Sequence, residues 1–347
     1  MTDVRKQRLT EIDSLRGIAA IAVVLFHYTT RFDELYGHVS TPVAAIRWGH
    51  LGVNLFFMIS GFVIFMTLER TSNATDFLVS RFSRLYPAYW AAVLMTFIIT
   101  NFLGLPGKQV DFSTALANMS MVHSLFSIKN VDGVYWTLEV ELLFYVMALL
   151  AFQFRLIPKL HLLIAMMLLA RAIYFLSASI LHVDLPWIIY RLLILKFIPW
   201  FAAGIMIYRI ASNYGTPRRD FMILSACALV LALVDGIGNC VLMLLMSLAL
   251  YGATVGKIII LRNTILIGLG TISYTLYLIH ENIGWAIILK LENGGINSNA
   301  AIAVALTISI GLATLLTACV ERPALKWIRD KYRHRKEAST RQDQVLK

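Results

Sequence analysis

Two ionisable side chains, Arg16 and His27, lie within the first long apolar stretch of the chain, residues 11–30. Only apolar or small residues separate them, and eleven helical steps of about 100° return them to within about 20° of one helix face. An imidazole exchanges protons near neutral pH, and both side chains are costly in lipid, so we expect them to face a bundle interior at a functional site. The alternative is an arginine that reaches the membrane interface and a histidine that is hydrogen-bonded for packing.

Two carboxylates, Glu139 and Glu141, lie in another apolar stretch, where they need partners or a wet cavity. They are about 200° apart on a helix, so we do not expect both to face one site. Glu139 shares a face with Trp136, whereas Glu141 shares a face with Tyr145. Helical periodicity does not choose between the two carboxylates.

A polar stripe is formed by Ser273, Tyr277 and His280, which follow an i, i+4, i+7 spacing and precede Glu281. Hydroxyl groups and an imidazole on one helix face suit the recognition of a sugar or a carbonyl group. The alternative is a hydrogen-bonded seam between helices.

Arg81 and Arg84 are spaced i, i+3, and we expect them in a cytoplasmic loop, with Pro87 starting the next helix. Guanidinium groups bind phosphates bidentately, which favours a phosphorylated ligand at this position. Ordinary positive-inside charge is the alternative. Near the start of another apolar stretch, Gly52 and Ser60-Gly61 are small enough to allow close helix packing.

The composition is that of an integral membrane protein: of 347 residues 59% are hydrophobic and 15% charged, and the mean hydropathy is +0.71. The net charge of +11 is carried by short loops and tails between apolar stretches. This distribution follows the positive-inside rule, so we expect membrane lipid and not nucleic acid as a partner. The three cysteines lie in apolar segments without a Cys-x-x-Cys or Cys/His cluster, so we expect free thiols and no metal site.

The predicted fold is an all-α integral membrane protein with about ten transmembrane helices and both termini in the cytoplasm. We expect a single membrane domain over residues 1–347, with its core at 11–323 and a basic cytoplasmic tail at 324–347. The longest connection, 106–134, is expected on the outer side, with an interfacial or re-entrant helix around 115–126 and a part in acceptor choice. The expected spans are 15–30, 51–68, 88–105, 135–154, 161–181, 192–211, 221–234, 237–255, 266–289 and 300–320.

Taken together, six motifs resemble the membrane acyltransferase-3 family, the multi-span acyltransferases of bacterial surface polysaccharides. They are Arg16-x10-His27, Gly52-x3-Phe56-Phe57-x2-Ser60-Gly61-Phe62, Arg81-x2-Arg84-x2-Pro87, Trp136-x-Leu138-x2-Glu141-x2-Phe144-Tyr145, Ser273-Tyr274-x2-Tyr277-Leu278-x-His280 and Glu321-x-Pro323. Each motif alone is weak, but their order across residues 11–323 is specific. The Glu141 motif is similar to that of exopolysaccharide and O-antigen O-acetyltransferases. Glu139 stands where the family often has a small polar residue, so its role stays open.

The resemblance implies an O-acetyltransferase of the bacterial inner membrane, with cytoplasmic acetyl-CoA as donor. The implied acceptor is a sugar hydroxyl of an exopolysaccharide, O-antigen or related surface glycan, either finished or lipid-linked. His27 would be the general base, oriented by a carboxylate, although direct transfer and an acyl-histidine both stay open. The implied site residues are His27, Glu141 and Glu139 for catalysis, Arg16, Arg81 and Arg84 for the coenzyme phosphates, and Trp136, Ser273, Tyr277 and His280 for substrate.

A transporter or an export-complex subunit with intramembrane His and Glu residues is the alternative function. The sequence has no visible repeat and no matched pair of broken helices, which a transporter fold would favour. Arg81 and Arg84 discriminate between the classes, because an enzyme that uses coenzyme A needs phosphate ligands and a transporter does not.

Overall fold

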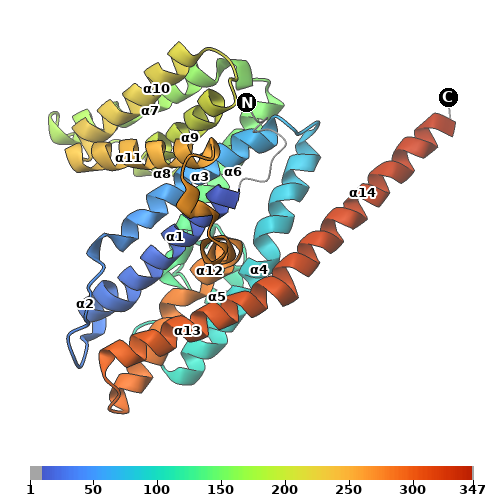
Figure 1. Ribbon diagram of the computed structural model, residues 1–347. Helices are drawn as coiled ribbons and strands as arrows, with labels where there is room; N and C mark the ends of the chain where they lie inside the picture. Colours follow the sequence, from blue (N-terminus) through green and yellow to red (C-terminus); the bar gives the residue numbers. More distant parts are fainter. Residues whose placement is uncertain (1–9, 346–347) are drawn as a thin grey trace. The chain divides into compact units, whose positions relative to one another are not determined.

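The computed structural model describes residues 10–345, and it describes side chains through residue 338. Every regular element in this part of the chain is a helix (Figure 1). The chain forms two compact units that interleave along the sequence, and each is described here by itself. The described residues are 10–23, 48–70 and 137–271 in unit 1, and 24–47, 71–136 and 272–345 in unit 2. A single membrane domain stays a prediction.

Unit 1 is organised around α9, which is buried along nearly its whole length and packs against four neighbouring helices (Figure 1). These four neighbours are α3, α7, α10 and α11, and the unit also contains α6, α8 and the first part of α1 and of α12. The bounds of these helices are Thr10–Phe26 (α1), Gly52–Leu68 (α3), Trp136–Gln153 (α6), Leu160–Ser179 (α7), Trp187–Leu192 (α8), Ile198–Ala211 (α9), Pro217–Val234 (α10), Ile237–Thr254 (α11) and Thr264–Asn293 (α12).

Glycines allow the close packing of α3 on α9, as the small residues of α3 predicted. A Cβ atom on Gly61 would overlap the carbonyl oxygen of Phe201, and one on Gly204 would overlap that of Met58. A Cβ atom on Gly52 would lie 2.6 Å from the carbonyl oxygen of Ala19 in α1. Backbone therefore meets backbone at these crossings, which is the packing that small residues permit in membrane helices.

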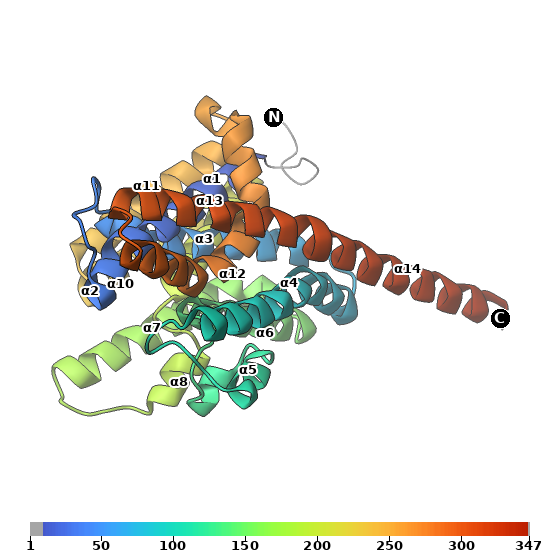
Figure 2. The ribbon, with the colours of Figure 1, turned by 90° about the horizontal axis from the view of Figure 1, so that it is seen from below.

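Unit 2 contains α4, the second part of α12, and the nearly continuous path of α13 into α14, beside which α4 packs (Figure 2). Two π-helical turns interrupt these helices, one after α1 and one between α13 and α14. The bounds are His27–Arg31 (π-turn), Phe32–Tyr36 (α2), Ala74–Leu103 (α4), Phe112–Asn118 (α5), Ser298–Leu316 (α13), Thr317–Glu321 (π-turn) and Arg322–Val345 (α14), with short 3₁₀ turns at His123–Phe126 and Gly133–Tyr135.

The helix α4 corrects one prediction, because Arg81 and Arg84 lie on it and not in a loop before it. The side chain of Asn73 accepts a hydrogen bond from the Asp76 amide at 2.8 Å and caps the helix well ahead of Pro87. Pro87 removes a single helical hydrogen bond, which a 30-residue helix tolerates when neighbours hold both halves. The two arginines therefore have fixed positions on a helix surface.

Seven helical segments of the described chain are long and apolar enough to cross a membrane. Each of the ten predicted spans corresponds to a helix, but three of these helices are weaker candidates. The helix α9 has 14 residues, α10 begins with the charged residues 218–220, and α12 carries the polar residues 280–282 in its middle. The prediction of an all-helical fold is thus confirmed for the described residues, with seven candidate crossings, whereas the number of ten spans and the side of each terminus stay predictions.

Candidate active site

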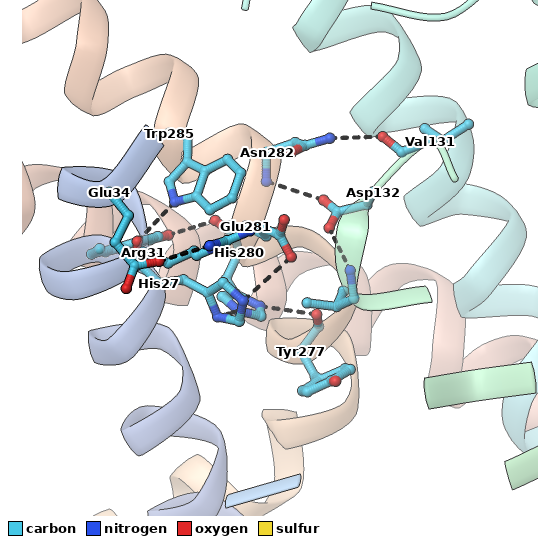
Figure 3. A network of polar contacts seen from close by, with 12 residues as sticks. His27, Arg31, Glu34, Val131, Asp132, Tyr277, His280, Glu281, Asn282 and Trp285 are labelled. Atoms are coloured by element: carbon cyan, nitrogen blue, oxygen red, sulfur yellow. Dashed lines mark hydrogen bonds and ion pairs between the residues drawn. The ribbon is translucent and has the colours of Figure 1, made fainter. Parts of the chain in front are cut away.

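His27 lies in unit 2 at the first position of the π-helical turn that follows α1 (Figure 3). Its carbonyl oxygen accepts the amide of Phe32, five residues later, and also the indole N–H of Trp285 at 2.8 Å. π-Helical turns occur frequently at functional sites. The His27 side chain is 14% exposed, so it is held in place by its neighbours and still reachable from outside.

His280 on α12 fixes the tautomer of His27. The Nδ1 atom of His280 lies 2.9 Å from the carbonyl oxygen of Tyr277, which can only accept, so Nδ1 carries the proton. In the neutral imidazole Nε2 is then an acceptor, and it lies 3.1 Å from the Nδ1 atom of His27. His27 therefore donates through Nδ1, and its Nε2 atom is the one that can take up a proton.

Glu281 is the carboxylate that approaches this proton-accepting nitrogen. Its Oε2 atom lies 3.4 Å from Nε2 of His27, which is an ionic distance beyond a normal hydrogen bond. The Glu281 residue is 5% exposed, so water screens the interaction little. A Cβ atom on Gly133 would overlap the Glu281 carboxylate, so a larger residue at this position would displace the carboxylate.

Asp132 lies directly before Gly133 and fastens the 106–134 connection to α12 (Figure 3). Its carboxylate accepts the backbone amides of Asn282 at 3.1 Å and Val134 at 3.3 Å. Burial raises the pKa of Asp132 to about 7, although the two amides and the charge of Lys108 oppose this rise. The site thus has a second buried carboxyl group beside Glu281, and burial disfavours its charged form.

Arg84 of unit 2 forms an ion pair with Glu321, at the end of the second π-helical turn. Its guanidinium lies 5.8 Å from the ring centre of Tyr274, whose hydroxyl donates to the carbonyl oxygen of Leu85 at 2.9 Å. Arg81 lies one helical turn before Arg84, as the i, i+3 spacing predicted. The structure therefore places Arg84 beside α12, with Arg81 one helical turn earlier on α4.

The arginine pair and the histidine pair are joined by α12. Tyr274, against Arg84, is six residues before His280, which corresponds to about 9 Å along a helix axis. Tyr277 lies between these two points, Ser273 directly precedes Tyr274, and both are buried, as is His280. The predicted polar stripe of α12 thus runs from the arginines to His27.

Glu139 belongs to unit 1, where it pairs with an arginine that the sequence analysis did not connect to it. Arg191 of α8 donates to Glu139 through Nε at 2.9 Å and through a terminal nitrogen at 3.1 Å. The residue Glu139 is 3% exposed, and a bidentate partner of this kind satisfies a buried carboxylate. This contact gives Glu139 a structural partner, and its catalytic role stays a prediction.

Glu141 also belongs to unit 1 and contacts two hydroxyl groups through one oxygen. Ser60 of α3 donates to it at 2.6 Å, and the hydroxyl of Tyr145, one turn later on α6, donates to the same oxygen. The shared face of Glu141 and Tyr145 is therefore confirmed, whereas the orientation of His27 by Glu141 stays a prediction.

Two further predicted site residues are at least partly exposed. Arg16 is partly buried on the unit 1 part of α1, and Trp136 is 42% exposed at the start of α6.

Three residues were not assigned a role from the sequence: Glu281 and Asp132 near His27, and Arg329 of α14, whose contacts are described below. The sequence shows that Glu281 directly follows His280. Adjacent side chains of a helix point about 100° apart, so the sequence gave no reason to expect that both residues contact His27. Asp132 is brought to α12 by an irregular segment, which no periodic pattern describes.

Comparison with known proteins identifies the chain. A family model described as "Acyltransferase domain" matches residues 9–319. "Putative acetyltransferase ORF330" of Acidianus two-tailed virus is 25% identical over 221 residues, which is 61% of each chain. An acyltransferase of Streptomyces mycarofaciens is 28% identical over 41% of this chain and 38% of its own, and nodulation protein 10 of Rhizobium leguminosarum bv. viciae is 29% identical over 38% and 41%.

The matches to these relatives span from about two fifths to three fifths of each relative's own length. No solved structure matches the chain. The family model covers nearly the whole described chain, and the apolar helices agree with a multi-pass membrane protein. The chain therefore belongs to the acyltransferase-3 family.

Proposed function

We propose that this protein is a membrane O-acyltransferase in which His27 acts as the general base on an acceptor hydroxyl. The observation that carries the proposal is a series of contacts that runs from the Tyr277 carbonyl through His280 to His27 and on to Glu281. This series leaves the Nε2 atom of His27 as the proton acceptor. A histidine whose Nδ1–H donates a hydrogen bond that fixes its tautomer is suited to act as the general base in acyl transfer to a hydroxyl.

In the proposed reaction, the acceptor hydroxyl gives its proton to Nε2 of His27 while its oxygen forms the ester bond. The imidazolium that results lies 3.4 Å from the Glu281 carboxylate, and this charge pair lowers the cost of the proton transfer. The proton then goes to the sulfur that leaves as the donor's thioester bond breaks. An acyl-coenzyme A donor supplies an activated acyl group, so the protein has no need to activate it further.

The donor is proposed to be acetyl-CoA, with its phosphates at Arg81 and Arg84. Both arginines are only partly buried, and Arg84 lies beside the α12 stripe that leads to His27, one helical turn after Arg81. Guanidinium groups bind phosphate oxygens in a bidentate fork, so these side chains suit the coenzyme's charged end. The proposed acceptor is a sugar hydroxyl of an exopolysaccharide, O-antigen or related surface glycan, and the proposed location is the bacterial inner membrane.

The first test uses cells that lack the gene, complemented with the wild-type protein, His27→Ala or, as a matched control, His182→Ala. His182 is exposed in the connection after α7. We expect the wild type and His182→Ala to restore an ester on the surface glycan, and His27→Ala, present at the same membrane level, to leave it absent. An ester pattern that is the same with and without the gene would contradict the proposed acceptor, and restoration by His27→Ala would contradict the proposed base.

A further inference from the structure

The last helix of the described chain, α14, lies outside residues 9–319, the part matched by the family model. It packs along α4 in an antiparallel direction (Figure 2). Glu321, just before α14, pairs with Arg84, whereas Tyr332 near its middle donates to Asp76 at 2.8 Å, close to the start of α4. A chain of specific contacts therefore holds α14 against the helix that carries the predicted phosphate ligands.

Arg329 points from α14 toward these ligands. Its Nε atom lies 3.3 Å from the Ser83 hydroxyl, and one terminal nitrogen lies 3.4 Å from both the carbonyl and the hydroxyl oxygen of Ser80. Ser80 and Ser83 alternate along α4 with Arg81 and Arg84. Arg329 is accordingly held at the surface that these two arginines share.

The charges that act on Arg329 have one sign, and the Glu321 carboxylate nearby already pairs with Arg84. Among the described residues, the hydrogen-bond partners of Arg329 are neutral, and its electrostatic neighbours are the cations Arg81 and Arg84. Like charges that gather at one place repel each other, and a bound polyanion removes that repulsion. Arg329 is also exposed, so a ligand can reach it from outside the helix pair.

We propose that Arg329 joins Arg81 and Arg84 in a three-arginine site that binds the nucleotide phosphates of the acyl donor. The site thus takes ligands with two or more phosphate groups and is completed by a helix beyond the acyltransferase domain. This inference rests on the proposed function for the identity of the donor. A phospholipid headgroup offers the same phosphate chemistry, and the experiment separates the two sources.

The test uses the full chain in lipid nanodiscs and compares the wild type with Arg329→Gln. We expect the variant to raise the KM of acetyl-CoA about 10- to 100-fold, the usual effect of losing a charge-assisted hydrogen bond. The kcat value and the KM of S-acetylpantetheine, which lacks the nucleotide phosphates, are expected to stay unchanged, and Arg329→Lys is expected to recover part of the lost affinity. The matched control is Arg333→Gln, which removes an exposed arginine of α14 that pairs with Asp330.

The alternative is that Arg329 only helps to hold α14 against α4. The variant Tyr332→Phe tests this alternative, because it weakens the same helix contact at another residue. This variant removes the hydrogen bond to Asp76 and so weakens α14 docking without changing charge. If Tyr332→Phe raises the KM of acetyl-CoA as much as Arg329→Gln does, or if Arg329→Gln raises the KM of S-acetylpantetheine equally, the phosphate site is wrong. If Arg329→Gln has an effect only in nanodiscs that contain phosphatidylglycerol, the site binds lipid and the proposal is also wrong.

The failure of the proposed function looks different from the failure of this site. If the wild-type protein binds no acetyl-CoA in nanodiscs with or without phosphatidylglycerol, both proposals are wrong. A wild-type protein that binds and uses acetyl-CoA, with an Arg329→Gln variant of equal KM, overturns the three-arginine site alone.

Discussion

The Nδ1 atom of His27 and the Nε2 atom of His280 lie 3.1 Å apart, and only one of them can hold the proton between them. Because His280 already donates through its own Nδ1 atom to backbone carbonyls, that proton belongs to His27. In many acyl-transfer sites a carboxylate contacts the corresponding nitrogen. Here a neutral imidazole fixes the tautomer, and the carboxylate of Glu281 lies on the other side of the His27 ring.

Substitution of His280 tests this arrangement. We expect His280→Ala to lower kcat about 100-fold or more, because His27 loses the partner that holds its ring and tautomer. Rates of acetyl transfer and the amount of folded protein recovered from membranes are to be measured together. A variant that is normally abundant and fully active would show that His280 only fills space.

Removal of the Glu281 charge tests the stabilisation of the imidazolium. Glu281→Gln keeps the size of the side chain, and we expect kcat to fall about 10- to 100-fold with little change in the KM of the donor. Glu281→Asp is the matched variant, and it should recover part of the rate because it retains the charge. A loss that appears only in KM would assign Glu281 to ligand binding instead.

Gly133 offers a second way to reach Glu281. We expect Gly133→Ala to displace the carboxylate and to lower kcat, because the added Cβ atom would occupy the position of its oxygen. In the Glu281→Gln background the same change should have a smaller effect, since the two residues act through one contact. Additive effects in this double-mutant cycle would show that Gly133 acts independently of Glu281.

The buried carboxyl of Asp132 predicts a dependence of stability on pH. An Asp in the unfolded chain ionises near pH 4, whereas burial raises the pKa of Asp132 in the folded protein to about 7. The folded state therefore holds a proton that the unfolded state has lost, and the stabilisation, complete below about pH 4, decreases as the pH rises to about 7. Asp132→Asn should lose less thermal stability than the wild type between pH 5 and pH 8, as measured by unfolding in detergent, and equal losses would rule this out.

Glu139 is predicted to act on stability and not on the chemical step. Glu139→Gln breaks the bidentate pair with Arg191, and we expect the folded state to lose about 1–3 kcal/mol, the cost of a buried group with an incomplete partner. The melting temperature should fall while the kcat of the remaining folded protein stays the same. A normal melting temperature with a lost kcat would return Glu139 to the catalytic residues.

The sequence motifs pointed to His27, the two arginines and the polar stripe of α12, and helical spacing described the faces that these residues share. Their roles in catalysis and binding stay predictions. Orientation within unit 2 was less accessible. His27 contacts two adjacent residues, His280 and Glu281. Adjacent residues of a helix point in different directions, so helical periodicity would assign only one of them to the face toward His27. Glu139 and Glu141 were attractive because buried carboxylates are rare in membranes, yet their contacts are to Arg191 and to hydroxyl groups.

The course of α4 through Pro87 shows a second limit of sequence reasoning. Proline usually marks the start of a helix, so Arg81 and Arg84 were expected in a loop. The Asn73 cap and the contacts with α14 extend the helix before Pro87, and these contacts come from residues about 240 positions away. Local signals describe where a helix can begin, whereas distant packing decides where it does begin.

The π-helical turn that starts at His27 also bears on how such proteins are compared through evolution. The amide of Phe32 reaches back five residues to the His27 carbonyl, so this turn holds one residue more than an α-helical turn. In this wider turn the His27 carbonyl oxygen accepts both the Phe32 amide and the indole N–H of Trp285. A homologue with an α-helical turn here would have one residue fewer, so its alignment with this chain would need a one-residue gap between His27 and Phe32.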